Sequence, residues 1–144
     1  MSIFLSTYIK PVDLKGRVVV PKEFRVVLEK FHGFVAFRSH KQDAVDCFSM
    51  ERMEKLSTQI DESLDPFSID RDSLESAIFA DAVTLHFDKD GRVVLPEILL
   101  KHAQIDEQIA FVGRGSTFQI WNPDAFKEHQ ESVRKMLSSK KVEK

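Results

Sequence analysis

The chain contains a long internal repeat, and this repeat limits the possible folds more than any other feature. Residues 13–24 read DLKGRVVVPKEF and residues 88–99 read DKDGRVVLPEIL, an offset of 75. A weaker match links residues 47–53 with residues 120–126 at an offset of 73. Self-similarity of this kind indicates one structural unit used twice. The sequence therefore predicts two halves that share one order of elements.

Each copy of the repeat predicts a tight turn between two strands. Apolar and polar residues alternate over residues 83–88, which is the period of a half-buried strand. Asp13 with Gly16, and Asp88 with Gly91, are turn formers, because aspartate bonds to nearby backbone and glycine adopts a positive φ at no cost. The valine-rich run after each turn is typical of a second strand. We interpret these four residues as structural.

Each of these second strands is expected to lead into a helix. Pro21 and Pro96 end the strand and suit the first turn of a helix, where a missing N–H costs nothing. In the first half, apolar residues then recur at helical spacing, and Gly33 is expected to cap the helix at its C-terminus. Two further strands and a helix complete each half. The predicted fold is α+β, with the order β-turn-β-α-β-β-α occurring twice.

Charge is distributed unevenly, although the formal net charge is only -2. Residues 1–45 carry 8 basic and 4 acidic side chains, residues 46–81 carry 3 and 10, and residues 82–144 carry 10 and 9. The basic first third could present an anion-binding face, and the acidic middle is interpreted as a solvated helical surface. The predicted organisation is a first module (1–65), a connecting helical segment (66–81), a second module (82–131) and a basic C-terminal tail (132–144).

The arginine directly after each turn is the main functional candidate. Arg17 and Arg92 begin a strand, where a guanidinium can bind phosphate oxygens or guanine O6 and N7 in a forked manner. Three more basic residues lie nearby in the first copy: Lys15, Lys22 and Arg25. The second copy has Asp90 and Glu97 at the equivalents of Lys15 and Lys22. We therefore expect the first turn to be the more basic and the better candidate for contact with a polyanion.

A purely structural interpretation of the same arginines stays open. The pairs Asp13–Arg17 and Asp88–Arg92 can simply lock each turn, with the carboxylate holding the guanidinium. A repeated motif supports a shared structural role as strongly as a shared functional one.

Other residue types indicate no catalytic or metal centre. The single cysteine, Cys47, lies in an apolar strand run and is expected to be a buried thiol. The five histidines lack the paired spacing of zinc ligands, and the carboxylates lack a pattern typical of acid/base catalysis. We expect no enzymatic activity, cofactor, metal or small-molecule ligand. Without a long apolar run or a signal-peptide layout, we expect a cytoplasmic protein that does not contact membrane.

The chain resembles the MraZ family of bacterial transcriptional regulators from about Phe4 to about His129. The resemblance is carried by the D-x-x-x-R motif with its Gly and Pro in both copies, by Ile78-Phe79-Ala80-Asp81-Ala82, and by Ile120-Trp121. It is also similar to the single-copy AbrB and MazE swapped-hairpin modules. One departure is Leu5-Ser6, where family members commonly have Arg-Gly.

This resemblance implies two AbrB-like modules that form a pseudo-twofold small β-barrel with flanking helices. It also implies a ring of several subunits in the nucleoid that binds double-stranded DNA at tandem direct repeats. These repeats would lie upstream of the division and cell-wall gene cluster that begins with the protein's own gene, which the protein would repress. Arg17 is the position that matches the family's DNA-contacting arginine, with Lys15 and Arg92 as further candidates.

Two parts of the chain have more than one interpretation. The basic tail is either a frayed helix end or an additional, sequence-independent contact with DNA. Phe67 falls outside the apolar periodicities, and we interpret it as a candidate contact with a neighbouring subunit. For the whole chain, the alternative function is an antitoxin-like protein-interaction module. The short, basic C-terminal end disfavours that alternative.

Overall fold

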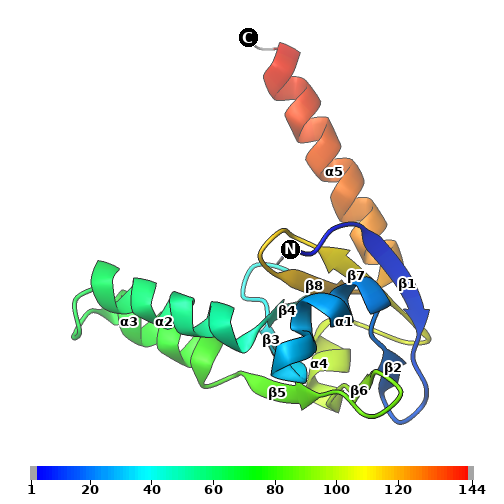
Figure 1. Ribbon diagram of the computed structural model, residues 1–144. Coiled ribbons are helices and arrows are strands. Elements are labelled where there is room, and N and C mark those ends of the chain that lie inside the picture. Colours follow the sequence, from blue (N-terminus) through cyan, green and yellow to red (C-terminus); the bar gives the residue numbers. More distant parts are fainter. Residues whose placement is uncertain (1–2, 143–144) are drawn as a thin grey trace.

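The computed structural model describes residues 3–142 of the chain (Figure 1). The first half of the chain forms four strands and two longer helices. Its strands and helices are β1 (Thr7–Pro11), β2 (Arg17–Val19), α1 (Lys22–Leu28), β3 (Gly33–Arg38), β4 (Val45–Phe48) and α2 (Met50–Ser63). A 3-10 turn, Glu29–Phe31, extends α1. The Ser49 hydroxyl caps α2 by accepting a hydrogen bond from the Arg52 N–H at 3.1 Å.

The second half begins after a helical connection and has the same succession of strands and helices. The connection is α3 (Ile69–Leu74) with a π-helical turn, Glu75–Phe79. The elements that follow are β5 (Val83–His86), β6 (Arg92–Val94), α4 (Glu97–His102), β7 (Gln108–Gly113), β8 (Phe118–Trp121) and α5 (Pro123–Val142). The α+β class predicted from the sequence is confirmed. Among residues 3–142, no helix is both long and apolar enough to cross a bilayer.

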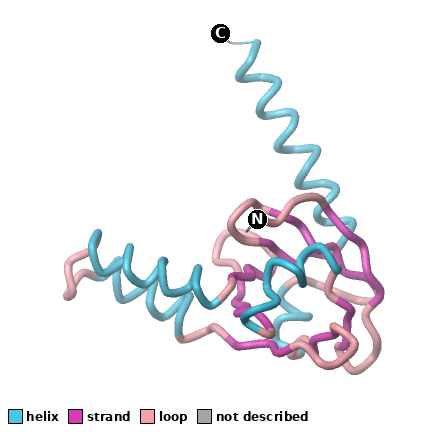
Figure 2. The backbone as a smooth tube through the Cα atoms, in the orientation of Figure 1, coloured by secondary structure: helices cyan, strands magenta, loops and turns pink. Residues whose placement is uncertain are grey.

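The two halves are interleaved in the main sheet, whose strands are magenta in Figure 2 and coloured by sequence in Figure 1. Six antiparallel strands lie in the order β1-β7-β8-β4-β3-β5, and β2 pairs with β6 in a separate two-stranded ribbon. The first strand of each half therefore pairs with the third strand of the other half, as Thr7 opposite Val112 and Val83 opposite Ala36. Neither half can complete its sheet alone, because its neighbours come from the other half.

An aromatic cluster fills the core between the sheet and the short helices. Phe118 is fully buried, and its ring centroid lies 4.9 to 5.0 Å from those of Phe4, Phe24 and Phe34. Such tilted and edge-on ring pairs add about 1 kcal/mol each beyond the burial of their apolar area. Cys47 is fully buried in the same cluster, and burial raises the pKa of its thiol well above the usual value. The expected buried thiol is confirmed.

Two helical elements project from this body. The first, which we call the arm, consists of α2 with α3 and the π-helical turn, and extends to the left in Figure 1. The second is α5, which starts on the sheet and continues into solvent. The basic tail predicted at residues 132–144 is, as far as residue 142, the distal part of this helix. Residues 143 and 144 lie outside the described part of the chain.

The base of the arm is attached to β3 by an ion pair. Arg38 Nη2 lies 2.5 Å from Asp81 Oδ1, and the Arg38 backbone N–H donates to Asp81 Oδ2 at 2.9 Å. The hydrogen bond from the Arg38 side chain holds the pKa of Asp81 below its usual value, and the Coulombic attraction of Arg38 acts in the same direction. Asp81 belongs to residues 78–82, one of the segments that carry the resemblance to the MraZ family.

The expected glycine cap of α1 is wrong. His32 occupies the left-handed conformation at the helix end, with φ of 57°. Gly33 instead begins β3, where a Cβ atom would lie 2.1 Å from the carbonyl oxygen of Leu85. Glycine is required there by the close approach of β5, which sequence periodicity in the first half does not reveal.

Replacing Asp81 with asparagine should reduce the acid sensitivity of folding. A carboxylate with a lowered pKa stabilises the fold above the unfolded pKa near 4, and this contribution is lost as pH falls through the lower, folded value. The stability difference between wild type and Asp81→Asn should therefore shrink as pH falls below about 4. Urea unfolding at several pH values measures it, with Asp106→Asn as the control. A difference that does not vary with pH would contradict the prediction.

Candidate nucleic-acid interface

The two turns of the repeated motif have the same hydrogen-bond pattern. In the first, Asp13 Oδ1 accepts hydrogen bonds from the backbone N–H groups of Lys15 and Arg17, both at 2.9 Å. In the second, Asp88 Oδ1 accepts from Asp90 and Arg92 at the same distances. The aspartate thus holds the backbone of each turn, which explains why this residue type recurs at this position.

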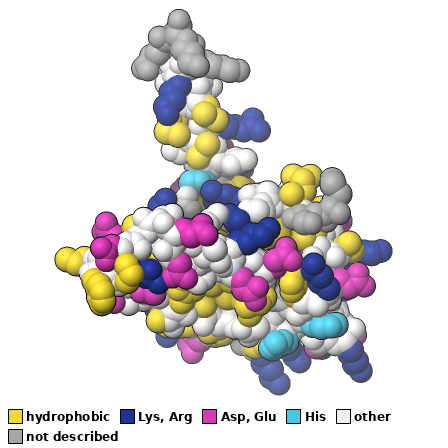
Figure 3. Space-filling model, turned by 60° about the vertical axis from the view of Figure 1, so that its left-hand side comes forward, with side chains coloured by type: hydrophobic (Ala, Val, Ile, Leu, Met, Phe, Trp, Pro, Cys, Tyr) yellow, Lys and Arg dark blue, Asp and Glu magenta, His cyan; other side chains and the backbone are white. Residues whose placement is uncertain are grey.

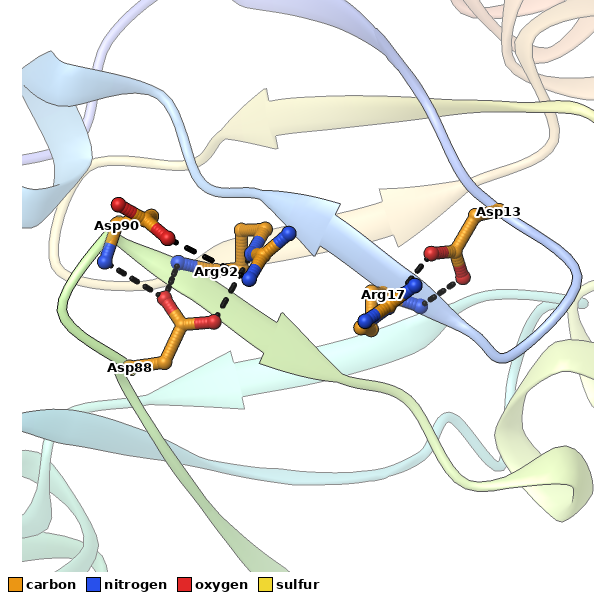
Figure 4. Close-up of polar contacts among 5 residues, drawn as sticks. All are labelled: Asp13, Arg17, Asp88, Asp90 and Arg92. Carbon is orange, nitrogen blue, oxygen red and sulfur yellow. Dashed lines mark hydrogen bonds and ion pairs between the residues drawn. The ribbon is translucent and has the colours of Figure 1, made fainter.

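The same carboxylates also orient the two arginine side chains (Figure 4). Arg17 Nε lies 2.6 Å from Asp13 Oδ2, and Arg92 Nε lies 2.9 Å from Asp88 Oδ2. The backbone hydrogen bonds are the largest cause that lowers the pKa of both carboxyls, and the arginine side-chain hydrogen bonds lower it further. The hydrogen bond to Asp88 in turn raises the pKa of Arg92. The pairing expected from the structural interpretation is therefore present in both turns.

The arginine–aspartate pairs leave part of each guanidinium available. Within residues 3–142, the two terminal nitrogens of Arg17 make no hydrogen bond or ion pair. Arg92 Nη2 lies 3.4 Å from a second carboxylate, Asp90. Both side chains remain more than one-third exposed. Locking the turn and presenting a guanidinium edge are thus compatible, and Arg17 is the less neutralised of the two arginines.

The β2–β6 ribbon places both arginines on one outer face. In its antiparallel register, Arg17 lies opposite Val94, Val19 opposite Arg92, and Val18 opposite Val93. The central Val18–Val93 pair is buried in the core, so the other two pairs face outward. Val19 is 39% exposed and Val94 is 55% exposed. The outer face therefore has two guanidinium groups with two exposed valines beside them.

Sequence reasoning missed the two exposed valines. The run of three apolar residues after each turn predicts a strand but does not by itself show which of them face outward. The short length of that strand and its period of two could have indicated that its middle residue alone faces the core.

The two motif glycines tie the turns to the opposite half. Gly16 has φ of +84°, and a Cβ atom there would lie 2.6 Å from the Leu95 carbonyl oxygen. The Leu95 N–H donates to the Gly16 carbonyl at 2.9 Å, and reciprocally the Val20 N–H donates to the Gly91 carbonyl at 3.1 Å. A residue larger than glycine at position 16 would push Leu95, which directly follows β6, away from the first turn.

The expected clustering of basic residues around the first turn is wrong. Because β2 runs antiparallel to β6, the end of β2 and the start of α1 lie beside the second turn. Lys22 and Arg25 accordingly line a cavity of about 400 Å³ with Asp88, Lys89 and Gly91. The first turn has Lys15 from its own half and lies beside α4 of the other half, with Glu97 and Lys101.

The Arg25 side chain is held against the second turn. Its Nε donates to the Val20 carbonyl at 3.0 Å, and its guanidinium packs against Gly91. Pro21 and Pro96 directly precede α1 and α4, one residue before the first helical turn in which the sequence places them. Both ends of the ribbon are therefore basic, and the charge difference between the two turns is smaller than the sequence alone predicts.

Comparisons with known proteins agree on one family. Residues 78–144 match the family described as "MraZ protein, putative antitoxin-like". A protein of Rickettsia akari named transcriptional regulator MraZ is 46% identical over 138 residues, covering 94% of this chain and 92% of its own length. The protein of the same name from Rickettsia felis is 44% identical over 144 residues, covering 99% of this chain and 96% of its own.

Alanine at Gly16 should be more destabilising than alanine at Gly115. Both glycines have a positive φ, but a Cβ at Gly115 would meet no atom within 4 Å. Gly115→Ala should cost about 1–2 kcal/mol from the left-handed backbone alone. Gly16→Ala should cost at least about 1 kcal/mol more, because Leu95 must move. Urea unfolding of both variants checks this, and equal losses would contradict the close approach described above.

Proposed function

This chain belongs to the MraZ family of transcriptional regulators, a non-enzymatic family, and we propose that it binds double-stranded DNA through the β2–β6 ribbon. The observation that carries the proposal is the shared outer face of the ribbon, where Arg17 and Arg92 stand beside Val19 and Val94. A two-stranded ribbon fits the major groove of B-form DNA. In that groove a guanidinium reads guanine, and an apolar side chain contacts a thymine methyl group.

The surrounding basic residues supply contacts to the DNA backbone. Lys15 is exposed at one end of the ribbon, and Lys22 and Arg25 lie at the other. Contacts of this type position a protein without reading sequence, and they make binding sensitive to salt. In the proposal Arg17 is the main base-reading residue, since one carboxylate neutralises it, whereas two neutralise Arg92.

The binding site rests on a duplicated AbrB-like module, with halves at 1–65 and 82–131 joined by the segment 66–81. Adding 75 to a residue number in β1 and subtracting 75 from that of its partner in β7 gives the register of β5 with β3. Tyr8 opposite Phe111 thus corresponds to Val83 opposite Ala36. The pair Val18–Val93 lies on the implied pseudo-twofold axis. This symmetry supports the proposed barrel-like core, in which each half completes the other.

Several copies acting together would provide the affinity that one ribbon lacks. A few phosphate contacts give only weak binding that falls steeply with salt. A ring of subunits on tandem direct repeats makes later contacts intramolecular and raises avidity by about 10²–10⁴. In this proposal the repeats lie upstream of the protein's own division and cell-wall gene cluster, and binding represses it. The protein would then act in the cytoplasm, on the nucleoid.

A second candidate function is an antitoxin-like interaction with another protein. The description of the matching family includes the word antitoxin-like, and this word supports the second candidate function. Purified protein that fails to bind its own upstream DNA and instead copurifies with one defined partner would support it. Binding to that DNA by the protein alone would support the regulator.

Replacing Arg17 with alanine should abolish specific binding to the upstream repeats. One forked contact with guanine contributes about 1–3 kcal/mol, so the affinity for a single site should fall by about ten- to hundredfold. On an array of repeats these losses multiply, so binding to the array should fall to the nonspecific level. Fluorescence anisotropy with specific and scrambled duplexes measures the loss, and mass determination checks the assembly. Unchanged affinity for the specific duplex would exclude Arg17 from the interface.

Two further variants separate base reading from charge. Arg17→Lys keeps the charge but loses the planar fork, so specific binding should fall toward the nonspecific level while nonspecific binding persists. Arg92→Ala should weaken specific binding less than Arg17→Ala does. A larger loss at Arg92 would mean that the second turn is the main reading head. Lys41→Ala, which removes one exposed charge from the loop between β3 and β4, is the control.

A further inference from the structure

The distal part of α5 is a helix segment that lacks a packing partner in the described chain. Its proximal part packs on the sheet, where Phe126 and Ala125 contact the cluster that includes Trp121. Beyond this contact the helix extends into solvent as far as residue 142 (Figure 1). Short helical segments without tertiary packing are marginal in water. A partner surface would explain why this segment is helical.

This distal segment is both apolar and basic. Met136 and Leu137 are each about half exposed. Arg134, Lys135 and Lys140 surround them, and residues 132–140 contain no acidic residue. Among residues 3–142, none of these three basic side chains forms an ion pair.

The end of the arm has the opposite character. Phe67 is 96% exposed and Ile69 is 85% exposed, at the point where the chain passes from α2 to α3. Residues 50–79 carry 8 acidic and 3 basic side chains. Two of the three basic residues, Lys55 and Arg71, pair with carboxylates of the arm itself. Several carboxylates around the apolar pair have no ion-pair partner within residues 3–142: Glu62, Asp65, Asp70 and Asp72.

We propose that the distal part of α5 docks on the end of the arm of a second copy of this chain. In this contact the apolar side chains of α5, which lie among basic groups, meet the apolar side chains of the arm, which lie among acidic groups. Such complementarity of charge determines which surfaces associate. Figure 3 shows hydrophobic side chains at the end of the arm with acidic ones nearby, and hydrophobic and basic ones along α5. The proposal deepens the assembly part of the proposed function by naming the two surfaces that join.

This contact is head-to-tail, because each copy supplies a different surface to each neighbour. Heterologous contacts of this kind close into rings or continue as filaments. The arm and α5 leave the body in different directions, so one copy can use both surfaces at once (Figure 1). The β2–β6 ribbon takes no part in the contact and remains available for DNA.

A charge-exchange experiment tests the contact with the full-length chain. The helix variant is Arg134→Glu/Lys135→Glu, and the arm variant is Glu62→Lys/Asp72→Lys. Each alone places like charges opposite one another and should weaken self-association at least tenfold. Mixing the two variants restores opposite charges at every contact between unlike copies, so the mixture should assemble again with the two variants alternating. Native mass spectrometry and light scattering measure the size of the assembly. Lys41→Glu/Lys101→Glu is the control, because it changes the net charge by the same amount as the helix variant.

The outcomes separate this inference from DNA binding. Wild-type protein that is monomeric, or variants that assemble like the control, would overturn the proposed contact. Variants that stay dissociated when mixed would overturn it as well. A helix variant that assembles normally but loses affinity equally for all duplexes would assign α5 to the DNA backbone instead. Binding of one repeat by a dissociated variant tests the ribbon separately, and its absence would count against the DNA proposal alone.

Discussion

The antiparallel pairing of β2 with β6 is the constraint on which the rest of the molecule depends. It buries Val18 against Val93 at the centre of the structure and brings two turns, 75 residues apart in sequence, to opposite ends of one ribbon. The reciprocal hydrogen bonds between Gly16 and Leu95 and between Gly91 and Val20 fix each turn to the opposite half. The exchange of β1 and β5 in the main sheet extends the same interleaving. The halves therefore share one core and one sheet.

The aspartate–arginine pair within each turn explains how a stable turn can also present a hydrogen-bonding edge. An aspartate that binds the turn backbone and the arginine Nε fixes the guanidinium without occupying all of it. A fixed side chain loses less conformational entropy on binding than a free one. In the proposed DNA contact the aspartate would therefore support recognition even though it reduces the local positive charge. The structural and functional interpretations of the repeated motif thus describe two uses of the same interaction.

Local chemistry was predictable from the sequence, whereas the relation between the halves was not. The turns at Gly16 and Gly91, the strand ends at Pro21 and Pro96, and the buried Cys47 all follow from residue types and spacing. The positions of Lys22 and Arg25 beside the second turn depend on strand register, which no single-half pattern contains. The role of Gly33 likewise depends on the approach of β5 from the other half. The errors therefore arise where the halves meet.

Chemical protection of the upstream repeats tests most directly whether the ribbon reads the major groove. Dimethyl sulfate methylates guanine N7, which faces the major groove, and adenine N3, which faces the minor groove. The account predicts that bound protein protects guanine N7 once per repeat, and that Arg17→Ala removes this protection. Protection confined to adenine N3, or guanine protection that persists without Arg17, would contradict it.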